Sequence, residues 1–343
     1  MALIVMADDG IAFDGTTPET GPLGGAEAAF LALAEAFAAR GHRVLVRNRC
    51  KKPLAHKGVL WESIAAGVPE RADLYIANRA DRLIGLARQA QCRIFWIHNP
   101  GRYLRKPRYV LALLRHRPII VTIGAYHAAT VPWWMPRGGS AIIPYGIAEA
   151  FRHAAPRATP PPRAIFTSNP LRGLAWLLDL WQARIHPALP QAELHLYCGP
   201  AVYGSVGDAK AAEMAAVLAR ADALEAIGVR RHAPLPRDAL VKALEASRAM
   251  LYRGDENETF CLAVAEAQAL GVPAVVQPLG SLPERVIDGV TGAVAANDEG
   301  FARAAVALLS DDALWQRRHK EALARQRGSS WNEVAARFEA LAA

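Results

Sequence analysis

Two glutamates with seven residues between them, Glu258 and Glu266, are the side chains of this chain best placed to bind a ligand. The first precedes the predicted start of a helix, and the second lies about one turn inside it. Each carboxylate can accept hydrogen bonds from a pair of ligand hydroxyls. The free backbone N–H groups at the helix start, near Cys261 and Leu262, are positioned for a phosphate between those hydroxyl-bearing groups. Sugar, diphosphate and ribose in that order describe a sugar nucleotide.

The run 258–276 as a whole resembles the retaining glycosyltransferases of family 4, which share the GT-B fold. Their pattern has a Phe two places after the first Glu, and a helix that ends in Gly-x-Pro before a buried strand. In this chain Phe260, Gly271 and Pro273 occupy those places. Two solvated glutamates on a surface helix would account for the spacing alone, but not for the whole run.

The resemblance implies a fold and a reaction. The fold would be α/β, with two doubly wound Rossmann-like domains facing a central cleft. The reaction would be transfer of a hexose-type sugar from a nucleoside-diphosphate sugar to a glycan or lipid-linked acceptor, with retention and without a metal or other cofactor. Glu258 would hold hydroxyls of the hexose as a catalytic-site residue, Glu266 would hold the ribose, and Phe260, Cys261 and Leu262 would line the site for the sugar donor.

The pattern of elements agrees with two domains. A chain of 343 residues is too long for one ordinary core, and short apolar runs alternate with Ala-rich helical stretches, which favours parallel sheets covered by helices. The expected strands are 3–6, 43–46, 74–77, 94–97, 119–122, 164–167, 193–197, 249–252 and 274–276, and the expected helices are 25–40, 174–185, 209–226, 236–246 and 301–309.

A Pro-rich stretch at 154–162 is the predicted domain boundary. The predicted N-terminal domain is 1–157, on the acceptor side, and the predicted C-terminal domain is 163–328, on the side of the nucleotide sugar. Residues 329–343 contain a helix with a Ser cap. By the resemblance, this helix crosses back onto the first domain.

Two motifs in the first half match the family. Gly24 and Gly25 open a helix, so the backbone can approach a phosphate or sugar closely, although turn glycines are common. His98 follows a buried strand run, where the family has a His that reaches the donor hexose. A packed or capping histidine is the alternative at such a place.

The loop after the first strand of the second domain carries Ser168, Asn169 and Arg172. The family has an Arg and, five residues later, a Lys before Gly, and both bind the diphosphate. Arg172 occupies the Lys position and can bind phosphate oxygens bidentately, or it is a surface charge at the entry to a helix. Thr167 stands where the first Arg is expected. We expect Ser168 or Asn169 to compensate by hydrogen bonding.

The charge is uneven, with +10 over residues 1–157 and −2 over 158–343. The stretch 102–117 has six Lys and Arg, no acid, and several apolar residues. It suits contact with an anionic membrane that carries a lipid-linked acceptor, and equally an ordinary helix with a solvated basic face. No DNA- or RNA-binding motif is present, so nucleic acid is not an expected partner.

The cysteines and the first residues of the chain indicate the cellular compartment. Four scattered cysteines without a C-x-x-C pair are typical of reduced thiols in a cytoplasmic protein, and no metal-ligand spacing occurs. Residues 1–6 have the pattern of a first strand and not of a signal peptide. We expect a cytoplasmic protein, peripheral at the inner membrane surface if the basic stretch binds lipid.

A GT-B sugar-nucleotide epimerase and a non-catalytic carbohydrate-binding protein are the alternative functions.

Overall fold

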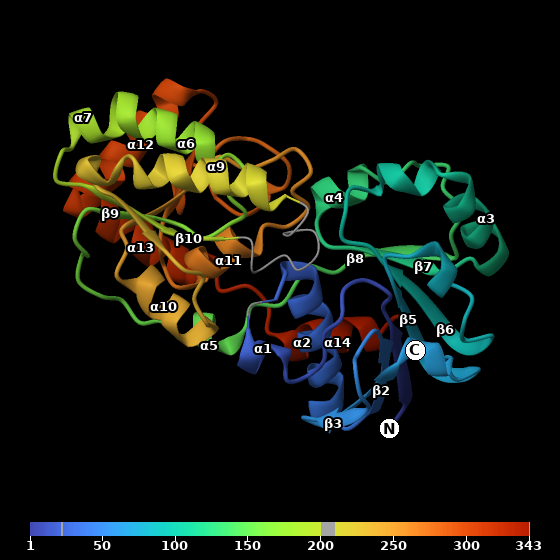
Figure 1. Ribbon diagram of the computed structural model, residues 1–343. Helices are drawn as coiled ribbons and strands as arrows, with labels where there is room; N and C mark the ends of the chain where they lie inside the picture. Colours follow the sequence, from blue (N-terminus) through green and yellow to red (C-terminus); the bar gives the residue numbers. More distant parts are fainter. Residues whose placement is uncertain (22, 200–209, 343) are drawn as a thin grey trace. The chain divides into compact units, whose positions relative to one another are not determined.

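The structure is a computed structural model that describes residues 1–21, 23–199 and 210–342. The chain divides into two compact units (Figure 1). Unit 1 comprises Met1–Gly146 and Ser329–Ala343, and unit 2 comprises Ile147–Gly328. The predicted boundary lay in the Pro-rich stretch 154–162. The division falls earlier because the short helix α5 (Glu149–Arg152) packs on helices of unit 2 and buries Phe151 completely.

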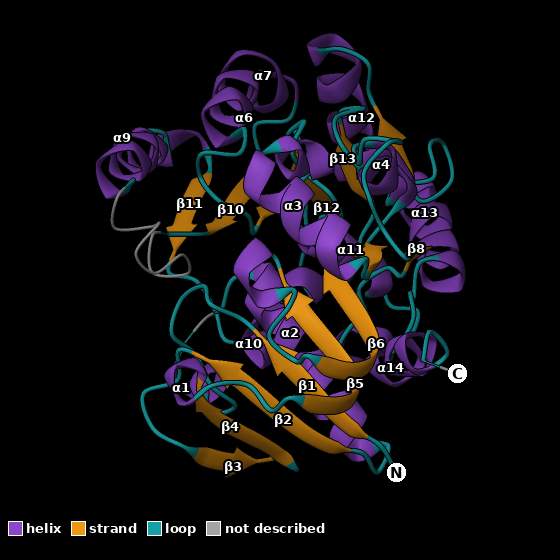
Figure 2. Cartoon of the chain, turned by 90° about the vertical axis from the view of Figure 1, so that its right-hand side faces the viewer, coloured by secondary structure: helices purple, strands orange, loops and turns teal. Residues whose placement is uncertain are grey.

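Unit 1 is built on an eight-stranded sheet with the order β3-β4-β2-β1-β5-β6-β7-β8. All neighbours are parallel except β3 and β4. Figure 2 shows β4, β2, β1, β5 and β6 side by side, with β3 at the edge. The strands are β1 (Leu3–Ala7), β2 (Arg43–Asn48), β3 (Leu54–His56), β4 (Val59–Ser63), β5 (Arg71–Asn78), β6 (Gln89–Trp96), β7 (Ile119–Thr122) and β8 (Gly139–Ile142).

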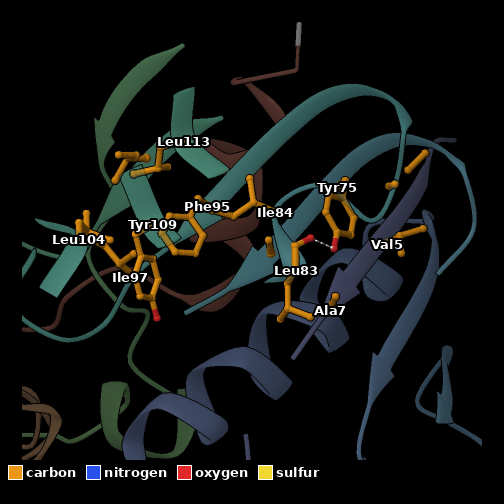
Figure 3. Close-up of a cluster of buried hydrophobic side chains, with 14 of the residues drawn as sticks. Val5, Ala7, Tyr75, Leu83, Ile84, Phe95, Ile97, Leu104, Tyr109 and Leu113 are labelled. Atoms are coloured by element: carbon orange, nitrogen blue, oxygen red, sulfur yellow. Dashed lines mark hydrogen bonds between the residues drawn. The ribbon is translucent and has the colours of Figure 1, made fainter. Parts of the chain in front are cut away.

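The central strands of unit 1 are almost wholly apolar, since parallel strands are covered on both faces. One hydrophobic cluster joins β1, β5 and β6 to the helical segments after β6 (Figure 3). Within it the Tyr75 hydroxyl donates a hydrogen bond to the Leu83 carbonyl oxygen at 2.6 Å, which satisfies the one polar atom of that ring. The α-helices of unit 1 are α1 (Thr17–Thr20), α2 (Gly25–Ala39), α3 (Pro107–His116), α4 (Ala125–Ala129) and α14 (Trp331–Glu339), and its 3₁₀ turns are η1 (Ile64–Ala66), η2 (Asp81–Leu83) and η3 (Gly101–Arg105).

Helix α14 belongs to unit 1 although it comes from the end of the chain. Ser330 caps it in a reciprocal pair with Glu333. Phe338 packs edge-on against Phe37 of α2 and Trp96 of β6, with ring centroids 6.4 and 5.3 Å apart. Arg40 also pairs with Glu339 at 2.6 Å. These contacts hold the terminal helix against α2.

Unit 2 has a six-stranded parallel sheet with the order β11-β10-β9-β12-β13-β14. Its strands are β9 (Arg163–Phe166), β10 (Glu193–Tyr197), β11 (Val229–His232), β12 (Ala249–Tyr252), β13 (Ala274–Val276) and β14 (Gly292–Val294). The helical segments besides α5 are α6 (Leu174–Leu180), the π turn η4 (Trp181–Ile185), α7 (His186–Ala188), α9 (Ala211–Asp222), η6 (Glu225–Ile227), α10 (Arg237–Glu245), α11 (Leu262–Ala269), η7 (Leu282–Glu284), α12 (Asp298–Ser310) and α13 (Asp312–Arg325).

These two sheets confirm the predicted α/β class with two parallel-sheet domains. Four predicted strands, 119–122, 193–197, 249–252 and 274–276, have the predicted bounds. The helix predicted over 209–226 begins at a residue outside the described ranges, and α9 covers 211–222 of it. Residues Val229–His232 form the edge strand β11 of unit 2. Among the described residues, no helix is long and apolar enough to cross a membrane.

Each sheet reverses its strand order at one point, and ligands of such sheets bind at the carboxyl ends of strands beside that point. In unit 1 the reversal lies between β1 and β5, and in unit 2 between β9 and β12. The loop after β1 leads to Gly24 and Gly25, and the residues after β9 and β12 include Arg172 and Glu258. The sheet order therefore directs attention to these loops.

Candidate functional site

The loops that follow β9 and β12 meet at the strand-order reversal of unit 2, where Arg172 contacts Glu258. The Arg172 Nη1 donates to the Glu258 Oε2 at 2.7 Å. The Tyr252 hydroxyl donates to the same oxygen at 2.8 Å, and the Ser168 hydroxyl lies 3.4 Å from that of Tyr252. Two of the predicted site residues, 86 positions apart in the chain, are thus brought into direct contact.

Burial determines the electrostatics of this pair. Glu258 is 8% exposed. Burial alone would lower the pKa of Arg172, but the Glu258 carboxylate raises it above its ordinary value, so the guanidinium stays charged. Burial raises the pKa of the Tyr252 hydroxyl well above its usual range, which keeps it a hydrogen-bond donor. The pair is a charged, partly buried site that can bind hydroxyls on one side and phosphate on the other.

Two glycines, Gly173 and Gly280, lie beside Arg172 and Glu258 in conformations that favour glycine. Gly173, with φ of +81°, would place a Cβ 2.8 Å from the Arg253 Cβ. Gly280, with φ of +57°, would place one 2.6 Å from the carbonyl oxygens of Asp255 and Glu258. Because real Cβ atoms do not approach other heavy atoms so closely, and both φ angles are positive, glycine lets these loops pack against the residues that carry the site.

Cys261 is the N-cap of α11 and has φ of +64°, a left-handed conformation that is unusual for a residue other than glycine. Its thiol is buried, and burial followed by the nearby Glu258 raises its pKa well above the usual range. The turn at Cys261 starts α11 directly after the Glu258 loop. The first N–H groups of a helix lack intrahelical acceptors and attract anions, so the turn brings an anion-binding helix end next to Glu258.

The second motif glutamate, Glu266, lies inside α11 and is 8% exposed. Arg237, the first residue of α10, donates to its Oε1 at 3.0 Å. Burial raises the pKa of Glu266, and the Arg237 charge opposes that rise. The Arg237 guanidinium also lies 5.7 Å from the Phe151 ring centroid. Arg237 and Tyr252 were both missed by sequence reasoning, because a partner across the fold leaves no local pattern.

Two predicted site residues, Asn169 and Phe260, have mainly structural contacts, whereas a third, Leu262, can offer its backbone N–H. Asn169 accepts a hydrogen bond from the Leu171 N–H at 2.9 Å and so forms the turn that leads to Arg172. Phe260 is 3% exposed, and Arg285 lies 4.3 Å over its ring. Leu262 is the first residue of α11 and only half-buried, so its backbone N–H is the group that can reach a ligand.

In unit 1 the residues at the strand-order reversal form a charged chain. Arg79 has φ of +63° and donates to Glu27 Oε1 and to Asp8 Oδ2, both at 2.8 Å. A Cβ at Gly24 would lie 2.6 Å from the Glu27 Oε2. Gly24 thus lies directly beside the carboxylate that pairs with Arg79. Gly25 opens α2 as predicted.

His98 lies two residues beyond β6, and both of its ring nitrogens are engaged within unit 1. Asp8 can only accept, so Asn78 donates its Nδ2 to Asp8 at 2.5 Å and turns its Oδ1 toward the ring. His98 Nε2 then donates to that oxygen at 2.5 Å, and Nδ1 accepts from the Tyr145 hydroxyl. Burial and the Arg79 charge lower the pKa of His98 well below its usual range. A substrate contact by His98, as predicted, would require one of these hydrogen bonds to open.

No group of three or more His, Cys, Asp or Glu in the ranges 1–21, 23–199 and 210–342 is arranged to hold a metal ion. The groups of unit 2 that are expected to bind the sugar donor are the Arg172 cation, the carboxylates of Glu258 and Glu266, and the start of α11.

Comparisons with known proteins agree with this arrangement. Residues 162–311 match the family model described as glycosyl transferases group 1. The D-inositol 3-phosphate glycosyltransferase of Xylanimonas cellulosilytica is 42% identical over 82 residues, which are 23% of this chain and 20% of that protein. The chain thus matches about a fifth of the length of this curated relative.

Two solved structures align over nearly the whole chain. Sucrose-phosphate synthase from Thermosynechococcus elongatus has a TM-score of 0.77 at 17% identity, covering 99% of this chain and 98% of its own. HepE of Anabaena, solved in complex with UDP-glucose, has a TM-score of 0.73 at 14% identity, covering 99% of each chain. At such identities these likenesses show the fold alone, which is GT-B. Residues 162–311, which are less than half of the chain, are therefore similar to the group 1 glycosyltransferases, and the whole chain shares the fold of the two solved structures.

Proposed function

We propose that the chain is a retaining glycosyltransferase that moves a hexose-type sugar from a nucleoside-diphosphate sugar to a glycan or lipid-linked acceptor. The observation that carries this proposal is the Arg172–Glu258 contact at 2.7 Å, at the strand-order reversal of unit 2 and next to the start of α11. Cation, carboxylate and helix start match the three parts of a sugar diphosphate: Arg172 and the helix start suit the phosphates, and Glu258 suits the sugar hydroxyls.

Each residue has a separate task in the proposed reaction. Glu258 holds hexose hydroxyls, and Glu266 holds the ribose. The backbone N–H groups of Cys261 and Leu262, with Arg172, stabilise the charge that develops on the leaving diphosphate. These groups need no metal ion to do so. The leaving phosphate helps to deprotonate the acceptor on the same face of the sugar, which gives retention.

Unit 1 supplies the acceptor side in this proposal. Gly24 and Gly25 leave backbone accessible at the start of α2. His98 reaches the donor hexose by opening one of its two hydrogen bonds. A lipid-linked acceptor would place the protein in the cytoplasm, peripheral at the inner membrane surface, with residues 102–117 toward anionic lipid.

The test is turnover of a sugar donor. UDP-glucose, which the Anabaena neighbour binds, is the first candidate, followed by GDP-, ADP- and TDP-sugars. The expected result is release of the nucleoside diphosphate with transfer to an oligosaccharide or lipid-linked acceptor, and a product whose anomeric configuration, measured by NMR, equals that of the donor. Conversion of a donor in the absence of any acceptor would favour an epimerase. Binding without turnover would favour a carbohydrate-binding protein.

A further inference from the structure

The part of unit 1 that follows β5 carries a long stretch without acidic residues. Residues 82–148 contain ten Lys and Arg and no Asp or Glu. The six Lys and Arg of 102–117 are all exposed. Of these, Arg108 pairs with Asp81 at 3.5 Å. A surface with such an excess of basic residues attracts an anionic partner, and the attraction acts over about a Debye length, ~10 Å at 0.1 M salt.

The exposed apolar side chains of the protein gather in the same region. Nine large hydrophobic side chains are exposed in the described part of the chain, and five of them lie on α3, in the loop after α4 or in the segment between η2 and β6. Trp133 is 86% exposed and Leu111 is 66% exposed. Single exposed hydrophobics are ordinary, but a cluster rimmed by charge marks an interaction surface. The five are Leu86, Leu111, Leu114, Trp133 and Trp134.

The loop that carries the two tryptophans is fastened beside α3 at both ends. The Gly101 N–H donates to the Thr130 hydroxyl at 2.7 Å, just before α3 begins. The Gly138 N–H donates to the Pro118 carbonyl oxygen at 3.0 Å, just after α3 ends. Between these points Met135 is buried in the core that α3 covers. Trp133 and Trp134 therefore protrude from a held loop and not from a frayed one.

Helix α3 itself has two different faces. Tyr109 and Leu113 point into the core, as Figure 3 shows. Residues three and four apart share a helix face, so Leu111, Leu114 and Arg115 lie together on the outer side, where all three are exposed. This outer face combines leucine with arginine, which is the composition of a helix that lies in a membrane interface.

We propose that α3 and the loop 131–137 form a membrane-docking surface, in which Trp133 and Trp134 insert into the interface of an anionic bilayer. The basic residues of 102–117 provide the attraction to the anionic lipid headgroups. The tryptophans provide the insertion, since Trp prefers the level of the lipid headgroups. A soluble polyanion would leave four large apolar side chains uncovered, so a bilayer fits the surface better. The inference rests on the proposed function only in that a lipid-linked acceptor gives docking a purpose.

The test is cosedimentation of the full chain with vesicles of phosphatidylglycerol and phosphatidylcholine. We expect binding at low salt that weakens as salt is added, and quenching of tryptophan fluorescence by lipids brominated in their acyl chains. The double variant Trp133→Ser/Trp134→Ser should bind at least about tenfold more weakly, the factor of one buried large apolar side chain, and should lose the quenching component. The variant Arg105→Glu/Lys106→Glu should also bind more weakly.

Ile287→Ser, at an exposed hydrophobic of unit 2, is the matched control and should bind as the wild type does. Absence of vesicle binding at low salt, binding to heparin alone, or equal binding by the double Trp variant would each overturn the proposal. Nucleotide-induced thermal stabilisation should be unchanged in the double Trp variant. If vesicle binding fails while that stabilisation persists, only the docking surface is wrong. If vesicles bind and no nucleotide does, only the proposed transferase function is wrong.

Discussion

Arg172 donates a hydrogen bond to Glu258 at 2.7 Å, so the guanidinium suited to a diphosphate is neutralised by the carboxylate suited to a hexose. A sugar nucleotide that binds here must share or replace this contact. The phosphate takes the cation, and the sugar hydroxyls take the carboxylate. This exchange makes the affinity for the nucleotide depend on the charge of Glu258.

Replacing Glu258 should separate transfer from nucleotide binding. We expect Glu258→Gln to lower the transfer rate by about 10²–10³, the usual effect of losing one group that stabilises the transition state. The same variant should bind the nucleoside diphosphate without its sugar at least as tightly as the wild type, because a negative charge near the diphosphate is removed. Titration calorimetry and a transfer assay measure the two effects. The exposed Glu256→Gln is the control, and clearly weaker diphosphate binding by Glu258→Gln would contradict the account.

Arg237 should limit how strongly the stability depends on pH through Glu266. Burial raises the pKa of Glu266 in the folded state, so the folded protein binds a proton more tightly than the unfolded one. The stability that this group contributes therefore falls as the pH rises from its pKa in the unfolded state to its pKa in the folded state. In Arg237→Gln the opposing charge is absent, so the pKa of Glu266 in the folded state rises further and the pH range over which stability falls extends upward. We expect the melting temperature of this variant to fall further below that of the wild type at pH 8 than at pH 5. The control is Arg231→Gln, which removes an exposed ion pair with Asp222 and should change the melting temperature little at either pH. An equal pH trend of the melting temperature in both variants would count against the assignment.

Cys261 should tolerate glycine better than valine. Its φ of +64° is costly for β-branched residues, by about 1–3 kcal/mol, and costs glycine little. We therefore expect Cys261→Val to lower the free energy of unfolding by about that amount, and Cys261→Gly to lower it less. Chemical denaturation measures both. Cys50→Val is the matched control, since Cys50 is equally buried, at 5% exposure, without a positive φ, and an equal loss at both positions would show that packing and not backbone conformation decides.

His98 should remain neutral and hold one tautomer. Burial and the Arg79 charge lower its pKa, so the folded state binds fewer protons than the unfolded state, and this group's contribution to stability is lost as pH falls below about 6.5. The hydrogen bonds to Asn78 and Tyr145 place the proton on Nε2. Nitrogen NMR of the imidazole should show this neutral tautomer from pH 8 to pH 5.5. A ring that titrates near its ordinary pKa, or one protonated on Nδ1, would refute the assignment.

The central sheets were predictable because their strands are buried on both faces. The strands 249–252 and 274–276 are continuous apolar runs bounded by polar or turn residues, and the structure has them with those bounds. The edge strands β3 and β8, and β4 beside β3, were missed because one face of each is exposed, so their residues do not form apolar runs. Helix α13 was missed because its pattern is dominated by polar residues.

The site was predictable where a motif is local and not where it depends on pairing across the fold. The placement of Glu258 before a helix and of Glu266 inside it followed from the run 258–276, and the structure has both. The partners Tyr252 and Arg237 come from other elements. The sheet order brings Tyr252 near Glu258, and the packing of both α10 and α11 on α5 brings Arg237 near Glu266. The hydrogen bonds of His98, which follows β6, likewise link it to Asn78 at the end of β5 and to Tyr145 after β8, and no local sequence pattern encodes them.

The central claim is that unit 2 binds a nucleoside-diphosphate sugar through Arg172 and the start of α11. Thermal unfolding with UDP-, GDP-, ADP- and TDP-sugars, without added metal, tests it most directly. A ligand at ~100 times its Kd adds about 2.7 kcal/mol, enough to raise the midpoint by several degrees. We predict such a rise with one nucleotide series in the wild type and in the exposed control Arg184→Ala, and its loss in Arg172→Ala. No rise with any of them, or an equal rise in Arg172→Ala, would contradict the account.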